Sequence, residues 1–171
     1  MNYKTKKLIL SILVPSDGLY IQRFLKHLRQ YETLIKKPTS IITTIRRIWH
    51  LRCYQRYAGK LGYCIGDGVL GKDVLFYHRG SIIINPDARV GDGCRFHGDA
   101  VLGVSHTNGT GCPTLGKNVD IGVGAKILGD IYIADNIIIG ANAVVTKSFY
   151  EPGITIAGIP AKKIKGPEDS N

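Results

Sequence analysis

Acidic residues, long apolar runs and paired cysteines are all scarce in this chain of 171 residues. Its 13 Asp and Glu against 23 Lys and Arg give a net charge of +10, which favours an anionic partner. Nucleic acid, a phosphate-bearing cofactor and a membrane surface fit that charge equally well. The apolar run over residues 8–14 is too short to span a bilayer, and no signal-peptide cleavage region follows it. We therefore expect a cytoplasmic protein, either free or at the inner face of the membrane.

The four cysteines, at positions 53, 64, 94 and 112, show no C-x-x-C spacing. Cys64 heads one hexad of the repeat described below, and Cys94 also falls at a position expected to be buried. This usage is typical of reduced thiols in the cytoplasm and not of a disulfide framework or a zinc site. We expect no bound metal.

A six-residue period organises residues 64–145. Each hexad begins with an apolar residue, often followed by glycine. These heads are Cys64, Leu70, Phe76, Ile82, Val90, Phe96, Leu102, Leu115, Ile121, Ile127, Ile133, Ile139 and Val145. A period of six fits neither an α-helix nor a single strand, and it predicts a mainly β protein, a parallel β-helix in which three hexads form one triangular coil.

The period is interrupted twice. The step from Ile82 to Val90 is eight residues, which predicts a small bulge at residues 85–87. The step from Leu102 to Leu115 is thirteen residues, which predicts a polar loop over residues 105–113. Insertions of this kind commonly carry function, because the regular coils offer few places to build a pocket.

Two helices are predicted before the repeat. Ser16 or Asp17 can cap a helix that extends to about Lys36, and a second helix over about residues 39–58 ends at Gly59. Apolar residues recur at helical spacing in both helices: Leu19, Ile21, Phe24, Leu25 and Leu28 in the first, and Ile41, Ile42, Ile45, Ile48 and Trp49 in the second. The other face of the second helix carries Arg46, Arg47, Arg52 and Arg56. We expect this face to be solvated, and contact with lipid headgroups or an acidic polymer is the alternative.

These patterns predict three parts: a helical extension (residues 1–60), a β-helix (61–166) and a polar tail (167–171). From about residue 60 to residue 166 the chain resembles the hexapeptide-repeat acyltransferases. The segments "GVGAKILGDIYIADNIIIGANAVVTKSF" and "AGIPAKKI" carry the resemblance, which is to the serine acetyltransferase-like branch. That branch includes O-acetyltransferases of capsular and other surface polysaccharides. The resemblance implies a homotrimer of left-handed β-helices with acetyl-CoA in the grooves between neighbouring prisms. A single smooth prism has no pocket of ligand size, which agrees with sites between subunits.

Acetyl transfer to an alcohol needs a base that accepts the hydroxyl proton, and histidine suits this role near neutral pH. His78, in "FYHRGSIIINP", falls on the family's base position. His97 follows a hexad head and could line the same groove one coil away, and His106 in the loop is a candidate substrate contact. We expect His27 and His50 to be surface or packing residues. The alternative for His78 is a structural histidine bonded between coils.

The acceptor positions differ from those of the serine-using members. The carboxylate that orients their base falls on Tyr63, and the aspartate before the base is Tyr77. Their Arg-His-Pro segment reads Gly111-Cys112-Pro113. A zwitterionic amino acid needs charged partners, whereas tyrosines suit the ring and hydroxyls of a sugar. We therefore expect Tyr63, Tyr77, His106 and Cys112 to bind a carbohydrate acceptor.

Small residues at the family's cofactor positions would let the pantetheine arm of acetyl-CoA lie along the coils, because Gly and Ala allow close backbone approach. These are Gly103, Val123, Gly124, Gly140 and Ala141. The turn Gly158-Ile159-Pro160-Ala161 would hold the far end of the cofactor. Lys162 and Lys163 would lie near the phosphates, and two merely solvated lysines are the alternative.

Several alternatives stay open from the sequence. The acceptor could be serine, for cysteine biosynthesis, or the β-helix could be a non-catalytic scaffold. A zinc enzyme of the carbonic-anhydrase type would need a third histidine beside His78 and His97, and none is evident. The group that orients His78 is undetermined, with Asp67, Asp73 or a neighbouring chain as candidates. Covalent catalysis through Cys112 is disfavoured against direct transfer, because no His–acid arrangement in the sequence would activate the thiol.

Overall fold

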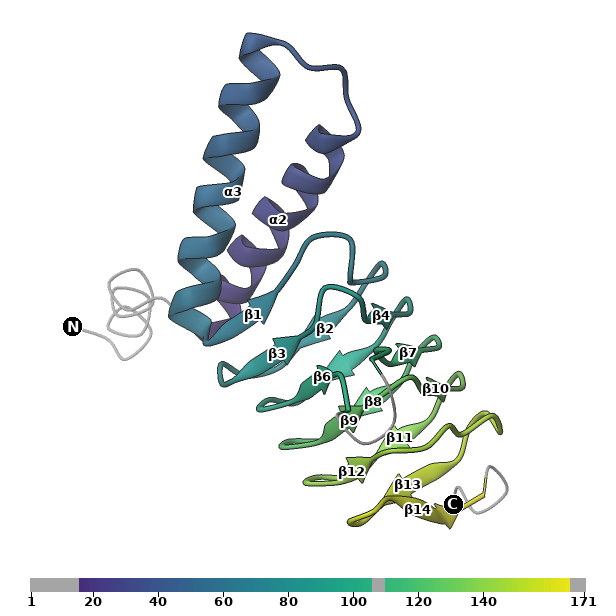
Figure 1. Cartoon of the computed structure of the whole chain (residues 1–171). Helices are drawn as coiled ribbons and strands as arrows, with labels where there is room; N and C mark the ends of the chain where they lie inside the picture. The colour runs from purple at the N-terminus through teal and green to yellow at the C-terminus, as the bar shows by residue number, and fades with distance from the viewer. Residues whose placement is uncertain (1–15, 106–109, 167–171) are drawn as a thin grey trace, which may run out of the picture. The chain divides into compact units, whose positions relative to one another are not determined.

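The computed structural model describes residues 16–105 and 110–166. The chain forms two compact units, Met1–Leu61 and Gly62–Asn171, and each is described here by itself (Figure 1). Among the described residues, no helix is long and apolar enough to cross a membrane. The candidate contact His106 lies outside the described residues.

The first unit is a hairpin of two helices, α2 (Asp17–Ile35) and α3 (Ile41–Leu61). Its buried side chains are Ile21, Phe24, Leu28 and Leu34 of α2 and His50, Tyr54, Ala58 and Leu61 of α3. Gly59 does not end α3 as predicted, because the helix continues for two more residues. Gly62 follows the last helical residue with a φ of 80°, the left-handed conformation in which glycine commonly ends a helix.

Ser40 and Arg47 fix the turn between the helices. The backbone N–H of Thr43 donates to Ser40 Oγ at 3.2 Å, and the backbone N–H of Ser40 donates to Thr43 Oγ1 at 2.7 Å. This reciprocal cap sets the start of α3 at Ile41. Arg47 donates to the carbonyls of Leu34 at 3.1 Å and Lys37 at 2.7 Å, which satisfies acceptors at the end of α2.

The second unit is a parallel β-helix with three sheets, so the predicted fold class is confirmed (Figure 1). Sheet A contains β1 (Tyr63–Ile65), β3 (Ile82–Ile84), β6 (Val101–Gly103), β9 (Lys126–Leu128) and β12 (Val144–Val145). Sheet B contains β4 (Arg89–Val90), β7 (Thr114–Leu115) and β10 (Tyr132–Ile133). Sheet C contains β2 (Leu75–Phe76), β5 (Arg95–Phe96), β8 (Asp120–Ile121), β11 (Ile138–Ile139), β13 (Thr155–Ala157) and β14 (Lys162–Lys165), which pairs antiparallel to β13.

The hexad heads form the core by stacking on their equivalents in the next coil. In sheet C, Phe76 pairs with Phe96, Phe96 with Ile121, and Ile121 with Ile139. The Phe76 and Phe96 rings are stacked with their centroids 5.2 Å apart. Most heads from Phe96 onward are completely buried, so the period mainly reports contacts between coils.

The sequence register of the first coils is wrong in two respects. Cys64 is exposed, and Ile65 is the inward residue that pairs with Ile84 in sheet A. From Ile84 to Val90 the step is therefore six, so residues 85–87 form an ordinary corner without a bulge. The two extra residues fall earlier, between Phe76 and Ile84, in the corner that contains His78. The error arose because β3 has two inward residues, Ile82 and Ile84, and the period alone cannot tell which one continues the column.

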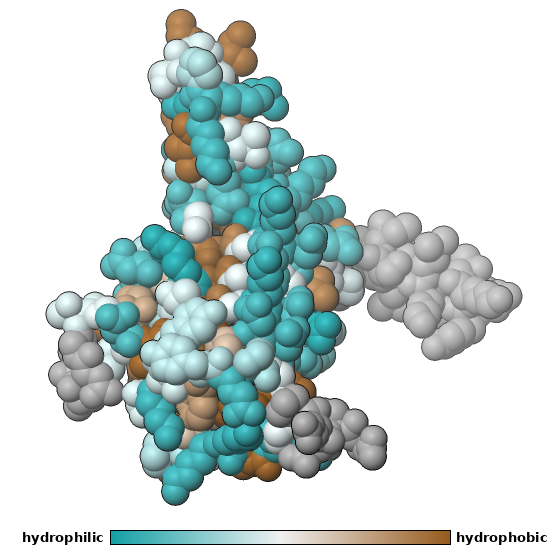
Figure 2. Space-filling view, turned by 90° about the vertical axis from the view of Figure 1, so that its right-hand side faces the viewer, coloured by the Kyte–Doolittle hydropathy of each residue, from teal (hydrophilic) through white to brown (hydrophobic). Residues whose placement is uncertain are grey.

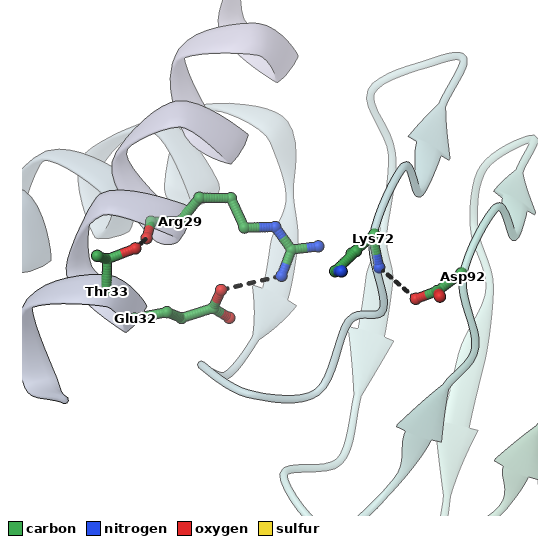
Figure 3. A network of polar contacts seen from close by, with 5 residues as sticks. All are labelled: Arg29, Glu32, Thr33, Lys72 and Asp92. Atoms are coloured by element: carbon green, nitrogen blue, oxygen red, sulfur yellow. Dashed lines mark hydrogen bonds and ion pairs between the residues drawn. The ribbon is translucent and has the colours of Figure 1, made fainter.

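Aspartates at the corners tie each coil to the one before it. Asp92 Oδ1 accepts a hydrogen bond of 2.7 Å from the backbone N–H of Lys72 (Figure 3). Asp99 and Asp135 accept 2.7 Å bonds from the N–H groups of Ser81 and Lys117 in the same way. These carboxylates satisfy corner N–H groups that the ladders leave unpaired. Figure 3 also shows the Arg29–Glu32 ion pair of the helical unit, 2.9 Å long.

Candidate functional site

One corner of the prism, where the chain passes from sheet C to sheet A, carries most of the predicted site. His78 lies two residues after the inward head of β2. From the strand register, the equivalent positions in the next coils are Gly98, Val123, Ala141 and Gly158. The structure thus places the predicted base in line with three predicted cofactor residues. Four strand spacings separate the ends of this row, about 19 Å.

His97 has a carboxylate partner that the sequence did not predict. Its Nε2 lies 2.7 Å from Asp120 Oδ1, with the two side chains 37% and 25% exposed. Arg95 Nη1 lies 3.6 Å from the other oxygen of the same carboxylate. Asp120 is therefore held between an imidazole and a guanidinium. Such a carboxylate orients the imidazole ring.

Tyr77 packs on the His97 ring. Its ring stacks on the His97 ring with centroids 4.7 Å apart and planes 12° from parallel, and the side chain is 46% exposed. Tyr77, and not His78, is thus the residue one coil directly beside His97. Below them, Arg95 and Asp120 line a cleft of about 330 Å³ together with Asn118, Asn136 and Ile138.

Arg95 and Asp120 could have been found from the sequence. Each directly precedes a hexad head, Phe96 and Ile121, and so points outward on its strand. The heads are 25 residues apart because the predicted loop adds seven residues to an 18-residue coil. Subtracting the loop would have placed Asp120 beside Arg95.

Tyr63 holds the backbone at the base position. The side chain is buried, and its hydroxyl donates a hydrogen bond of 2.8 Å to the His78 carbonyl oxygen. Its ring packs on Phe76 with centroids 5.1 Å apart. The His78 ring is on the exposed side of this corner, and none of the hydrogen bonds or ion pairs found among the described residues involves it.

The glycines beside His97 allow the next coil to pack closely, and they supply no free hydrogen-bond donors. A Cβ on Gly122 would lie 2.6 Å from the backbone nitrogen of Ala141, and one on Gly140 would lie 2.8 Å from the Ala157 Cβ. Both N–H groups are bonded in the ladder, to the carbonyls of Ile139 and Ile156. The backbone N–H groups of these two glycines are therefore not available to a developing oxyanion.

The closing turn lies at the far end of the same corner. Gly158 has a φ of 98°, and its carbonyl accepts a bond of 3.0 Å from the N–H of Val144 in sheet A. Pro160 is exposed and Ala161 is buried. The N–H of Ala161 donates to the Val144 carbonyl at 2.8 Å, so the turn bridges sheets C and A.

Lys162 and Lys163, which follow the turn, are both exposed, and Lys163 forms an ion pair with Glu151. Lys163 Nζ contacts both oxygens of Glu151 at 2.7 Å. Gly124, on the corner itself, has a φ of 77°, which favours glycine.

Gly103 and Cys112 are not at this corner. Gly103 ends β6 in sheet A, and Cys112 lies where the chain passes from sheet A to sheet B. Burial, followed by the charges of Asp87 and Asp130, raises the pKa of the Cys112 thiol. A raised pKa makes this thiol a poor nucleophile, in agreement with direct transfer.

Neither aspartate considered for orienting His78 lies at its corner. Asp67 is in the corner between β1 and sheet B, and Asp73 is in the corner before β2, where its φ is 54°. Among the described residues, no group of three or more His, Cys, Asp or Glu could hold a metal ion.

No protein-family model matches the chain. In sequence, it is 39% identical over 97 residues to the serine acetyltransferase of Mycobacterium tuberculosis, an alignment that covers 56% of this chain and 42% of that protein. The chain spans about half the length of the curated relatives it matches.

Two solved structures resemble most of the chain in fold. The soybean serine acetyltransferase in complex with serine has a TM-score of 0.67 at 27% identity, covering 90% of this chain and 60% of that one. The Brucella abortus serine acetyltransferase in complex with coenzyme A also has a TM-score of 0.67, at 26% identity, covering 82% and 54%.

Proposed function

We propose that this protein is an acetyl-CoA-dependent O-acetyltransferase, because its β-helical unit is similar to serine acetyltransferases in sequence and in structure. The observation that carries the proposal is the corner row of His78, Gly98, Val123, Ala141 and Gly158. It places an imidazole at one end and the closing turn at the other, and Gly98, next to the imidazole, has open space where a side chain would be.

The reaction is direct transfer. The acceptor hydroxyl oxygen attacks the thioester carbonyl carbon while His78 takes the hydroxyl proton, and the carbonyl oxygen becomes an oxyanion. When the tetrahedral intermediate collapses, the C–S bond breaks and the protonated imidazole returns its proton to the CoA thiolate. Tyr63 fixes the His78 backbone for both steps through its bond to the carbonyl oxygen.

His97 and Asp120 form a hydrogen-bonded imidazole–carboxylate pair on the strands next to His78. In this proposal the pair holds the acceptor, because its imidazole can donate to or accept from a hydroxyl while Asp120 keeps the ring in place. If the reaction does not need His78, His97 is the alternative general base, because it already has the carboxylate partner that a catalytic imidazole commonly uses.

L-Serine is the acceptor favoured by the comparisons, since the relatives are named serine acetyltransferases and the soybean structure contains serine. They support serine better than the carbohydrate expected from the sequence. A carbohydrate hydroxyl remains the second candidate on one observation: Tyr77, half-exposed and stacked on His97, offers a ring face and a hydroxyl but no charge beside the base.

The test is thiol release from acetyl-CoA by the purified protein, with L-serine and with a panel of hexoses and N-acetylhexosamines, free and nucleotide-linked. With the preferred acceptor, we expect His78→Ala to lower kcat by about 10²–10⁴-fold. His27→Gln, in the helical unit, is the histidine control and should keep full activity.

Turnover with serine alone would remove the carbohydrate candidate, and turnover with a sugar alone would remove serine. Activity that survives His78→Ala but not His97→Ala would move the base to the His97–Asp120 pair. No thiol release with any acceptor, from a protein that binds acetyl-CoA, would refute the proposed O-acetyltransferase activity on these acceptors.

A further inference from the structure

The outer face of α3 is apolar at one end and basic along its length. Ile41, Ile42, Ile45, Ile48 and Trp49 are 82%, 70%, 62%, 48% and 56% exposed. The isoleucines recur at helical spacing on the side of α3 that is turned away from its buried residues. Trp49 lies at the edge of this side, where its ring also contacts the His27 ring of α2 with centroids 5.0 Å apart. In Figure 2, apolar atoms, in brown, lie exposed at the upper end of the helical unit. We call this surface the α3 outer face.

The charge around this face has one sign. From Thr33 to Gly66 the sequence contains seven Lys and Arg and no Asp or Glu. Arg47 is used within the hairpin, where it binds backbone carbonyls. Arg46 and Arg52 are exposed next to the apolar residues.

The face continues along α3 into a cationic cavity. Arg56 and Lys60 follow Arg52 at four-residue spacing, and both line a cavity of about 410 Å³. The remaining lining residues are Tyr20, Arg23, Cys53 and Tyr57. Three cations and no acid line it, which suits a phosphate group. The stretch from Ile45 to Lys60 is about 22 Å long, the reach of a helix lying flat on a surface.

We propose that the α3 outer face docks on an anionic lipid bilayer, with its Ile and Trp side chains among the acyl chains near the headgroups and its cations at the lipid phosphates. Apolar residues, tryptophan and Lys or Arg together are the composition of interfacial helices. Anionic headgroups supply the negative charge that this segment lacks. The proposal does not depend on the enzymatic activity.

Two other occupants fit less well. A second copy packed through the same face in a twofold arrangement would bring Arg46 and Arg52 against the same cations, with no acid in the segment to compensate. A nucleic acid would use the cations but would leave the exposed isoleucines in contact with water or phosphate. Of these three occupants, a lipid surface is the one that meets both the apolar and the cationic part of the face.

Trp49 is the only tryptophan in the chain, so its fluorescence reports on this face directly. The full-length protein is titrated with vesicles of phosphatidylcholine containing one-third phosphatidylserine, and with vesicles of phosphatidylcholine alone. We expect the Trp49 emission to shift to shorter wavelength and to be quenched by brominated acyl chains only with the anionic vesicles. Added salt should weaken binding, because it screens the headgroup charge.

The variants separate the two contributions. Ile45→Asp and Arg46→Glu should each weaken vesicle binding at least tenfold, about 1.4 kcal/mol or more. Lys117→Glu makes the same charge change on an exposed residue of the β-helix and should leave binding unchanged. Circular dichroism would establish that each variant is folded.

Three results would overturn the proposal. Vesicle binding without a change at Trp49 would place the contact elsewhere in the chain. A Trp49 emission already at short wavelength and indifferent to vesicles, together with a change of oligomeric state in Ile45→Asp, would make the face an interface between copies. Equal binding to neutral and anionic vesicles would remove the role of the cations.

Discussion

Replacing Tyr63 by Phe removes a single hydroxyl group and tests whether the base is held through its backbone. The ring should stay in place, because it is 5% exposed and packs on Phe76. What is lost is the 2.8 Å hydrogen bond to the His78 carbonyl oxygen. A bond of this kind contributes about 1 kcal/mol net. Since 1.4 kcal/mol corresponds to a factor of ten in rate, kcat should fall by no more than about tenfold.

Two measurements check this prediction. The free energy of unfolding, from urea denaturation, should fall by about 1 kcal/mol. In steady-state kinetics kcat should fall while KM for both substrates stays unchanged, because a buried hydroxyl does not touch them. Tyr150→Phe, at a tyrosine that is 74% exposed, should change neither quantity. A raised KM for the acceptor with unchanged kcat would refute the backbone role and make Tyr63 the acceptor contact expected from the sequence.

Three further predictions concern stability and thiol reactivity. Gly91→Ala should lower the free energy of unfolding by about 1–3 kcal/mol, because the new Cβ would overlap the carbonyl group of Gly116 and lie 2.9 Å from the backbone nitrogen of Lys117. Gly59→Ala, with open space in α3, should raise the free energy of unfolding by about 0.5–1 kcal/mol. Urea denaturation of both variants checks the two signs. Burial raises the pKa of Cys94 to about 11, so iodoacetamide should modify it at pH 8 only after unfolding, as mass spectrometry would report. Burial first, and then the positive charges of nearby basic residues, lowers the pKa of both His27 and His50 below 6.5, so the unfolded state binds protons that the folded helices exclude. Melting followed by circular dichroism should therefore show helical stability that is complete at pH 7.5 and lost as the pH falls below about 6.5, and less so in His27→Gln.

The sequence predicted the parts of the fold that repeat. Stacked heads such as Phe96, Ile121 and Ile139 lie in the same buried environment, so the same kind of residue recurs there and the repeat can be recognised in the sequence. The failures are at the first coil, where β3 has two inward residues, and in α3. There, helical spacing identified an apolar stripe but could not show which stripe faces α2. In the structure the buried residues of α3 include His50, Tyr54 and Ala58, and the isoleucines of the predicted stripe are exposed.

The candidate site was predictable where it follows the coil and not where it depends on contacts between coils. His78, Val123 and Ala141 fall in one row because the six-residue period sets their positions. The His97–Asp120 pair spans two coils separated by the loop, so its spacing in sequence is irregular. Tyr63 was matched to a carboxylate position by resemblance alone, and only the packed structure shows its hydroxyl directed at a backbone carbonyl.

The two interruptions of the period lie at different corners of the prism, and this bears on assembly. The extra residues beside His78 are between sheets C and A, whereas the loop before Cys112 is between sheets A and B. Along the chain, sheet A lies between these two corners. In a cyclic trimer each interface joins two different patches, and the corner of one prism can meet the loop corner of the next. A site that needs both would then be complete only in the assembly, so activity should disappear on dilution below the concentration at which the subunits separate.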